Sequence, residues 1–528
     1  MSPRLDRRPA ADPRRRQVEA ALARAGLLRR PHAVGDVAGA GVFGRDLREA
    51  LAGLGPVFHE FGIYLASRVD LLAAGDCLEL AALPRRLEPL PQETVYLRLA
   101  AALGTPPEET FAEIAAVPFA SRLPVQAHRA RLRDGRPVVV QVARDAADVE
   151  RAPDLELLEL LGEPLAAQGA SPAALAEAIA GFRRDLALRA DLAHTARGLE
   201  LLALDARAFG LLAAPALHRG LSGPRVLVTD DPGGLPLAAV LATGDPAAVE
   251  AARRLCVVWL RQALLGRVFP LEPDGEGTEV LADGRVSFAC GSFAEPAAAV
   301  QRDHGDLLVA LAARDQEGAA TYLLRALRAE PGAAPEERVR LDLRQVVPFR
   351  DGAWSPAADS LAEHLFAAVR AARACGWAPR EPLLELCRGL FGAAAAARRP
   401  APEGDVLRDA LQEMRVLTSL NQVREALDPL RVGSQLESYA TLLADLPQRL
   451  DALLTRGAVE EPPRPAAAPV ERAAPGSGRT AALLLALGAV ALVARPLAGA
   501  LGGLGEEVVA ALFLGVGALL LWAVGRNG

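Results

Sequence analysis

The chain contains no lysine, so all 59 of its basic residues are arginines, and its only asparagines are Asn421 and Asn527. A lysine that holds nucleotide phosphates is therefore excluded. Aromatic residues make up only 4% of the 528 residues, whereas alanine, leucine and arginine are abundant. Because these three are good helix formers, the composition predicts more helix than strand.

Cysteine is also scarce and scattered. The five cysteines are odd in number and form no C-x-x-C pair, which argues against a disulfide framework or a zinc site: Cys77, Cys256, Cys290, Cys375 and Cys387. A reducing compartment fits this usage. No apolar run opens the chain, so no secretory signal is expected. The net charge of −6 gives no reason to expect nucleic-acid binding.

A basic arm is expected at residues 1–44. Residues 1–30 carry nine arginines against three acidic residues, a local net charge of +6. Val18 and Leu22 recur at helical spacing within this stretch. Two interpretations stay open: a solvated arm, or a basic amphipathic helix that lies on an anionic membrane surface.

The C-terminal end has the longest apolar runs. Residues 480–494 and 508–524 are uncharged and nearly long enough to cross a bilayer, so residues 480–525 are predicted to form a transmembrane helical hairpin. Arg479 and Arg526 flank the pair on one side, which places the large N-terminal body in the cytoplasm, at the cytoplasmic membrane. A Pro/Ala-rich linker is expected at residues 457–479. Buried helices of a soluble domain are the alternative for the two runs.

Between arm and linker, the periodicity changes along the chain. Residues 45–116 have helical patterns, residues 126–144 read as a hairpin around Asp134-Gly135, and short strand signals follow at 224–230 and 280–291. Most of 300–456 is helical in pattern. The expected fold class is α+β, mostly helical, with a small strand-bearing lobe before a large helical one.

The segment 54–72, LGPVFHEFGIYLASRVDLL, resembles a signature of the UbiB/AarF family of atypical, protein-kinase-like proteins. Ten of its positions match: Leu54, Gly55, Pro56, Phe58, Gly62, Ser67, Arg68, Asp70, Leu71 and Leu72. Two departures matter, because Glu60 stands where the family has a lysine and Ile63 where it has a glutamine. Residues 126–130 and 224–237 continue the resemblance.

The resemblance implies a two-lobed kinase-like fold. It divides the body into a helical extension at 45–116, an N-lobe with hinge at 117–237 and a helical C-lobe at 238–456. It also implies that the residues of phosphoryl transfer are lost. Gln141 replaces the strand lysine, Leu271 the catalytic aspartate, Glu276 the metal-binding asparagine and Ala289 the second metal aspartate. The leading hypothesis is a membrane-anchored pseudokinase that binds or scaffolds, with no catalytic residue.

Two alternatives stay open. A divergent ATPase would bind ATP and Mg²⁺ through arginines and carboxylates in place of the usual residues, with these candidates: Arg122, Arg144, Asp185, Asp191 and Glu276. A ligand-free interaction protein would instead fill the cleft with Leu123, Val125 and Leu271.

Further candidates for a retained nucleotide site are Asp230 and Gly234, near the hinge. Asp274 and Glu276 form a carboxylate pair beside a glycine turn, which is more often a plain loop than a metal site. The resemblance implies a membrane lipid or an isoprenoid- or quinone-related partner. The oligomeric state is left open.

Overall fold

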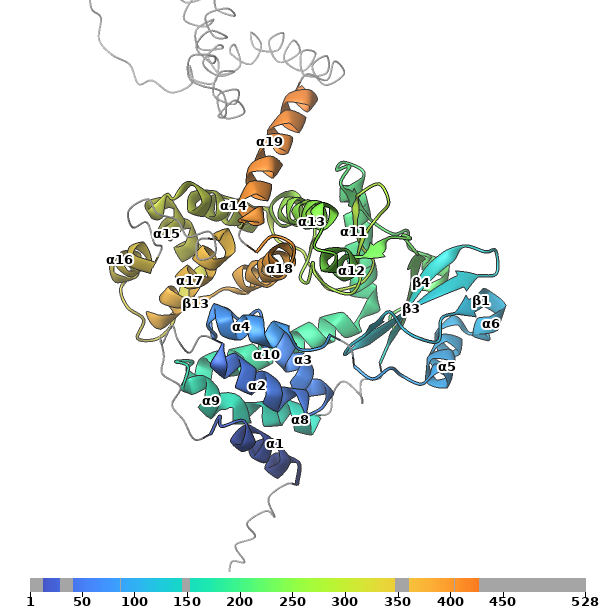
Figure 1. Ribbon diagram of the computed structural model, residues 1–528, viewed down its shortest axis with the longest axis horizontal. Coiled ribbons are helices and arrows are strands. Elements are labelled where there is room, and N and C mark those ends of the chain that lie inside the picture. The colour runs from blue at the N-terminus through green and yellow to red at the C-terminus, as the bar shows by residue number, and fades with distance from the viewer. Residues whose placement is uncertain are drawn as a thin grey trace, which may run out of the picture. The chain divides into compact units, whose positions relative to one another are not determined.

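The computed structural model describes residues 13–28, 41–85, 87–144, 152–346, 360–402 and 404–426 (Figure 1). The chain divides into two units at Gln412 and Glu413. The fold described below belongs to the first unit. Of the second unit, only the end of helix α19 (Val406–Ala426) is described.

Short helices from two separate parts of the sequence form the first helical layer, and Figure 1 shows them gathered on one side. They are α1 (Pro13–Arg24), α2 (Val42–Ala52), α3 (Pro56–Leu65), α4 (Ala74–Ala81), α8 (Ala152–Leu157), the 3₁₀ helix Leu158–Leu161, α9 (Gly162–Ala166) and α10 (Pro172–Ala190). Helix α3 starts at Leu-Gly-Pro because Gly55 has a φ of 96° and Pro56 suits the first helical position. Almost all of α3 is buried, which makes it the centre of this layer.

A five-stranded antiparallel sheet forms the smaller lobe. Its order is β1 (Phe111–Ile114), β3 (Val125–Leu132), β4 (Pro137–Ala143), β6 (Val226–Asp230), with β2 (Ala120–Ser121) beside β3. The predicted hairpin is confirmed, and its turn contains Gly135 at a φ of 91°. Val95 and Leu99 of α5 (Gln92–Leu103) pack on the valines of β4. The short helix α6 (Pro107–Thr110) leads into β1.

The boundary of this lobe differs from the expected one. Strand β1 and helix α5 belong to the sheet and its core, although both fall within 45–116, the range expected to be a separate helical extension. The periodic pattern of α5 identified a helix correctly. It does not identify the surface against which that helix packs.

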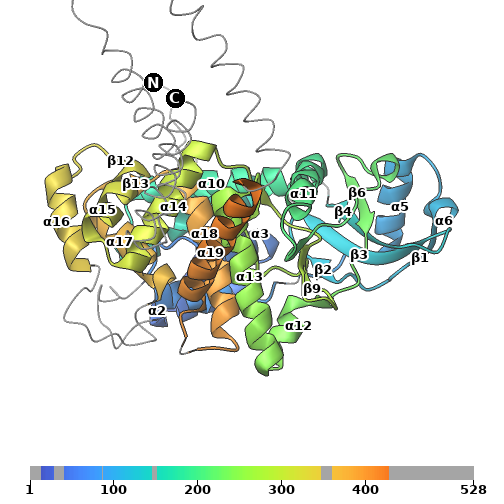
Figure 2. The same cartoon turned by 90° about the horizontal axis from the view of Figure 1, so that it is seen from above.

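The larger lobe is built around α13 (Pro246–Leu265) and α18 (Glu381–Arg398), which Figure 2 shows among the other helices. Trp259 of α13 is fully buried, and its indole Nε1 donates to the Pro270 carbonyl at 3.0 Å. A Cβ at Gly389 of α18 would lie 2.5 Å from the Trp259 ring, so only glycine permits this close packing.

The remaining helices of this lobe surround that pair. They are α11 (Leu192–Ala206), the 3₁₀ helix Arg219–Leu221, α12 (Leu237–Ala242), α14 (Ala298–Ala313), α15 (Gln316–Arg325), α16 (Glu336–Val346) and α17 (Leu361–Ala374). A small sheet has the order β5 (Leu212–Ala213), β10 (Val286–Phe288), β9 (Thr278–Val280), β7 (Leu235–Pro236). Two further strand pairs join β8 (Phe269–Pro270) to β11 (Phe293–Ala294) and β12 (Leu327–Ala329) to β13 (Trp377–Pro379). The predicted strand signals at 224–230 and 280–291 are thus confirmed, with shorter strands.

Residues 13–24 of the basic arm form helix α1, which is neither a solvated arm nor a helix with its apolar face free to lie on a membrane. Val18 and Leu22 are fully buried against the protein, and Arg14 binds both carboxylate oxygens of Asp154 at 2.8 and 2.9 Å. The apolar face of α1 therefore covers the helical layer and is available neither to solvent nor to a membrane surface.

The predicted linker at 457–479 and hairpin at 480–525 lie outside the described residues. Within the part of the chain that the structure describes, no helix combines the length and apolar character that a membrane crossing requires.

Candidate functional site

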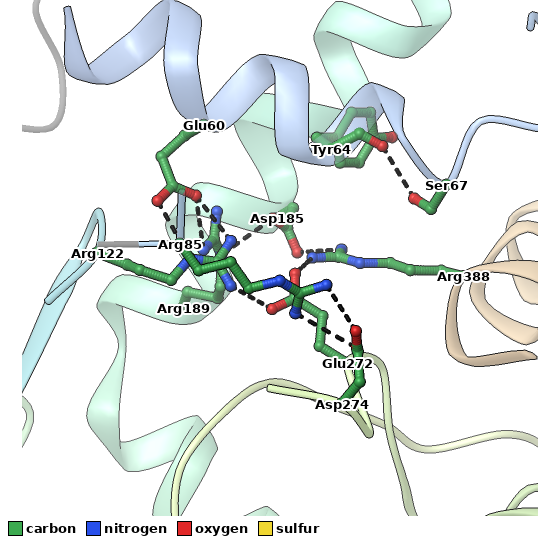
Figure 3. A network of polar contacts seen from close by, with 10 residues as sticks. All are labelled: Glu60, Tyr64, Ser67, Arg85, Arg122, Asp185, Arg189, Glu272, Asp274 and Arg388. Atoms are coloured by element: carbon green, nitrogen blue, oxygen red, sulfur yellow. Dashed lines mark hydrogen bonds and ion pairs between the residues drawn. The ribbon is translucent and has the colours of Figure 1, made fainter. Parts of the chain in front are cut away.

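Helices α3, α10 and α18 meet the loop after β2 and the loop after β8 at a dense cluster of charged side chains (Figure 3). Four arginines and four carboxylates alternate there, and we call this set the charge network: Glu60, Arg85, Arg122, Asp185, Arg189, Glu272, Asp274 and Arg388. Members that bind each other directly lie up to 203 residues apart in sequence. The network joins the helical layer, the sheet lobe and the larger lobe.

Glu60 is the innermost member, with no exposed side-chain surface. Arg122 donates from Nε and Nη2 to its two oxygens at 3.2 and 2.9 Å, and Arg189 donates to Oε2 at 3.2 Å. Burial by itself raises the pKa of Glu60, but the charges of Arg122 and Arg189 outweigh burial and bring that pKa below its ordinary value. Glu60 is therefore an ionised carboxylate between two guanidinium groups.

Glu272 and Asp185 are joined by Arg388 of α18. Arg388 donates to Asp185 Oδ1 and to Glu272 Oε1, both at 2.6 Å. Arg122 also binds Glu272, and Arg189 Nε lies 3.0 Å from Asp185 Oδ2. Burial opposes ionisation of both acids, yet the arginine charges lower the pKa of Asp185 and hold that of Glu272 well below its usual range. Both are ionised at neutral pH.

Asp274 completes the network. Arg85 donates to its two oxygens at 3.3 and 2.8 Å, and only 4% of the Asp274 side chain is exposed. Each of the eight charged groups thus has a partner of opposite sign. Buried charges need such compensation, because an unpaired one costs several kcal/mol.

Beside the network, the cleft between the two lobes is nearly closed. Its cavity is about 80 Å³, room for two or three water molecules. Leu123 and Val125 of the sheet lobe face Glu276 and Cys290 of the larger lobe across it. Ligand pockets of drug size are typically 300–1,000 Å³, so this cavity is too small for a nucleotide.

Gln141 bridges this cleft. It occupies the strand position where a phosphate-binding lysine was expected, and its Nε2 donates to the Ala289 carbonyl at 3.1 Å. Both residues are buried. The side chain that replaces the lysine therefore holds the lobes together and carries no charge.

Three other residues stand at positions where the resemblance implies functional residues: Leu271, Ile63 and Glu276. Leu271 is 6% exposed, and its backbone N–H donates to the Ser292 carbonyl. Leu271 lies outside the lining of the interlobe cavity, whereas the ligand-free alternative placed it in the cleft. Ile63 is buried within α3. Glu276 lines the cleft, where burial raises the pKa of the facing Cys290 thiol to about 12, with a further contribution from Glu276.

The candidates for a retained nucleotide site are not brought together. Asp185 belongs to the charge network, whereas Asp191 caps α11 by accepting from the Ala193 N–H at 3.0 Å. Asp230 pairs with His218 at 2.7 Å, and the Gly234 N–H donates to Glu279 at 3.1 Å. Each of the four candidates therefore has a different partner within the fold.

The arginines proposed for phosphate binding are similarly engaged. Arg122 binds Glu60 and Glu272, and Arg144 donates to the Glu88 carbonyl and to Ser121 Oγ, both at 2.9 Å. Asp274 binds Arg85 instead of joining Glu276 in a carboxylate pair. Over the described ranges, no group of three or more His, Cys, Asp or Glu side chains is arranged to hold a metal ion.

Sequence reasoning named Glu60, Arg122, Asp185 and Asp274, each in another role, and missed the other four network members. No motif marks these four: Arg85, Arg189, Glu272 and Arg388. The only sequence signal was the glutamate at a lysine position, because a carboxylate in an otherwise apolar helix requires cations near it. That signal predicts that the partners of Glu60 are positively charged, but it does not identify which residues they are.

Comparison with known proteins agrees with this architecture. Residues 82–323 match the model of the ABC1 atypical kinase-like domain. "Probable protein kinase UbiB" of Pseudomonas paraeruginosa is 32% identical over 197 residues, which cover 37% of this chain and 37% of that protein. The protein of the same name from Xylella fastidiosa is 42% identical over 118 residues, 22% of this chain and 21% of that one.

The matched stretches thus span 37% and 21% of the length of these two relatives. A solved complex of Rv3197 with erythromycin, from Mycobacterium tuberculosis, has 18% identity and a TM-score of 0.36, over 63% of this chain and 88% of that one. On the ABC1 match, the UbiB similarity and the motif at 54–72, the kinase-like fold is established. Residues 82–323 therefore form an ABC1 atypical kinase-like domain, and the chain is similar to proteins named UbiB.

Proposed function

We propose that this protein, with its ABC1 atypical kinase-like domain, is a pseudokinase: it retains the kinase-like fold as a binding or scaffolding surface and does not transfer phosphoryl groups. The observation that carries the proposal is the charge network. Arg122, the cationic side chain nearest to the cleft among those proposed for phosphate, is held by Glu60 and Glu272. A nucleotide would have to break these buried pairs before it gained any phosphate contact.

The chemistry of phosphoryl transfer supports the proposal. That reaction depends on a cation at the phosphates, carboxylate or amide ligands for magnesium, and a residue that orients the nucleophile. Gln141 is neutral and bridges to Ala289, while Leu271 offers no acceptor side chain. The cavity of about 80 Å³ gives no space for the adenosine.

We further propose that the protein is anchored at the cytoplasmic membrane, with its kinase-like body in the cytoplasm, and that it serves ubiquinone or related isoprenoid-lipid metabolism. The uncharged runs at 480–494 and 508–524 support the anchor. The similarity to proteins named UbiB supports the link to that metabolism.

The nucleotide test uses the purified full chain. We expect the melting temperature to be the same, within error, with and without millimolar ATP and Mg²⁺, and ADP release to stay at the level of buffer alone. A saturable, Mg²⁺-dependent rise in melting temperature with ATP turnover would overturn the pseudokinase proposal. If Asp185→Asn and Glu276→Gln then removed that turnover, the divergent ATPase would be the correct function.

The anchor is tested separately, by alkaline carbonate extraction of membranes from cells that express the full chain. The unmodified chain is expected to stay with the membranes, and the double variant Leu485→Arg, Leu514→Arg to be released, because a charge in the middle of a span opposes insertion. Leu341→Arg is the control, since Leu341 is 52% exposed on α16. Full release of the unmodified chain would refute the anchor.

A further inference from the structure

A second cavity lies at the start of α3. It is open to solvent, has a volume of about 670 Å³ and is lined by the start of α3, by Pro84 and residues 87–91, and by Leu123 and Arg144. Leu123 lines both this cavity and the interlobe cleft, so its side chain separates the two. The volume falls within the range of small-molecule sites in proteins, whereas that of the cleft does not.

The cavity wall is largely apolar. Four prolines, three leucines and one valine make up eight of its 14 lining residues, among them Val57, Leu87, Pro89 and Leu90. Such a wall favours ligands that bury apolar surface. Proline also favours an extended backbone at residues 87–91, because it fixes φ and cannot continue a helix.

His59 supplies a polar group to this wall. Its side chain lines the cavity and is 7% exposed, and Nδ1 is buried without a hydrogen-bond partner in the part of the chain that the structure describes. Burial lowers the pKa of His59, an effect that the Arg122 charge reinforces and the Glu60 charge opposes. The ring is therefore neutral at neutral pH, with one donor and one acceptor nitrogen. A buried polar atom without a partner is costly, and a bound ligand would remove that cost.

Two of the three charged side chains at the cavity already have partners. Arg144 donates to the Glu88 carbonyl and to Ser121, and Asp154 accepts from Arg14. The remaining charged group, the exposed side chain of Glu88, would repel an anion. An anionic ligand therefore finds no counter-ion that is not already used. A cationic ligand finds Glu88, but an ion pair with an exposed carboxylate contributes little.

We propose that this cavity binds a neutral, mostly apolar small molecule that makes one hydrogen bond to His59. The apolar wall contributes most of the affinity, and His59 orients the polar atom of the ligand. The site is separate from the nucleotide cleft. The proposal therefore does not depend on whether the cleft binds ATP, and a failure of either leaves the other standing.

The test uses benzophenone, which is neutral, apolar and has a single carbonyl acceptor, as a photo-crosslinking probe on the full chain. Peptide mass spectrometry then locates the adduct. We expect labelling of the peptides that contain Val57 and Leu87–Leu90, saturable with probe concentration. Labelling of the apolar runs at 480–524 does not involve His59 and serves as the internal reference.

Three variants make the test specific. His59→Phe keeps the ring volume and removes both nitrogens, and is expected to reduce cavity labelling about threefold to tenfold relative to the reference. Ala52→Trp is expected to abolish it, because Ala52 lines the cavity yet is exposed, so the larger side chain enters the cavity without disturbing a core. His304→Phe is the matched control: His304 is a buried histidine on α14, away from this lining, and should leave labelling unchanged.

The charged analogue 4-benzoylbenzoate tests the ligand class. We expect it to label the cavity at least threefold less than benzophenone does. Stronger labelling by the anion would overturn the neutral class. Absence of cavity labelling in the unmodified chain, or equal labelling in the His59→Phe and Ala52→Trp variants, would overturn the site itself.

Discussion

Glu60→Gln is the sharpest test of the charge network. The substitution keeps the size and one acceptor oxygen of the side chain and removes its charge. Arg122 then retains Glu272 as a partner, and Arg189 retains Asp185. The change therefore leaves two guanidinium groups with half of their compensation and does not fully orphan either.

The expected cost follows from burial. Removal of one partner from a buried ion pair typically costs about 3–5 kcal/mol. Because both arginines keep a second carboxylate, we expect a loss near the lower end, about 3 kcal/mol. The Arg122→Gln variant should also destabilise, and the two losses should not add, with a coupling energy of at least about 1 kcal/mol between these contacting residues.

The assay is unfolding of the full chain by urea and by heat, followed by circular dichroism. Glu295→Gln is the matched control. Glu295 accepts two hydrogen bonds from Arg197, at 2.8 and 3.0 Å, in the geometry of an arginine pair but at the surface, with the Arg197 side chain 65% exposed. Exposed pairs contribute little, so this variant should unfold with the parent chain.

The pH dependence gives an independent check. The folded-state pKa of Glu60 lies below its ordinary value, so its contribution is fully present above the unfolded pKa, near 4.3, and is lost as the pH falls through the lower folded value. The difference between the parent chain and Glu60→Gln should be constant from pH 6 to 8 and shrink below about pH 4. A loss no larger than that of Glu295→Gln, or strict additivity with Arg122→Gln, would refute the network as a stabilising element.

Two further substitutions probe other buried groups. Burial, with help from Glu381, raises the pKa of Glu385 to about 7, so its contribution to stability is present at low pH and lost as the pH rises through 7. Glu385→Gln should therefore raise the melting temperature by a few degrees at pH 8 and leave it unchanged at pH 4. An equal effect at both pH values would contradict the shift. Leu22→Ala should weaken the docking of α1 by about 2–5 kcal/mol, because Leu22 is fully buried. The α1 amides should then exchange their hydrogens faster, whereas unchanged protection would show that this face does not hold the helix.

The sequence predicted those parts of the fold that depend on local patterns. The hairpin of β3 and β4 was found because its turn, Asp134-Gly135, and its alternating strands lie within 20 residues of each other. The docking of α1 was not found, because the partner of Arg14 is Asp154, 140 residues away. Helical periodicity shows which face of a helix is apolar, and it leaves open whether protein or lipid covers that face.

At the candidate site, the sequence predicted which kinase residues are absent better than it predicted which side chains contact one another. The charge reversal at Glu60 and the neutral residues Gln141 and Leu271 were visible in the sequence. The partners of Glu60 were not, because Arg122 and Arg189 lie 62 and 129 residues from it. Nothing in the local sequence distinguishes these two arginines from the other 57 in the chain.

The pairing around Glu60 also restricts which sequences can carry this arrangement. A lysine at position 60 would place three cations together and leave Arg122 and Arg189 opposed by Glu272 and Asp185 alone. A chain with that lysine would have to lose one of the two arginines or gain another carboxylate. Residues 60, 122 and 189 are therefore expected to change together among related sequences, so that a glutamate at the first predicts arginine at the other two.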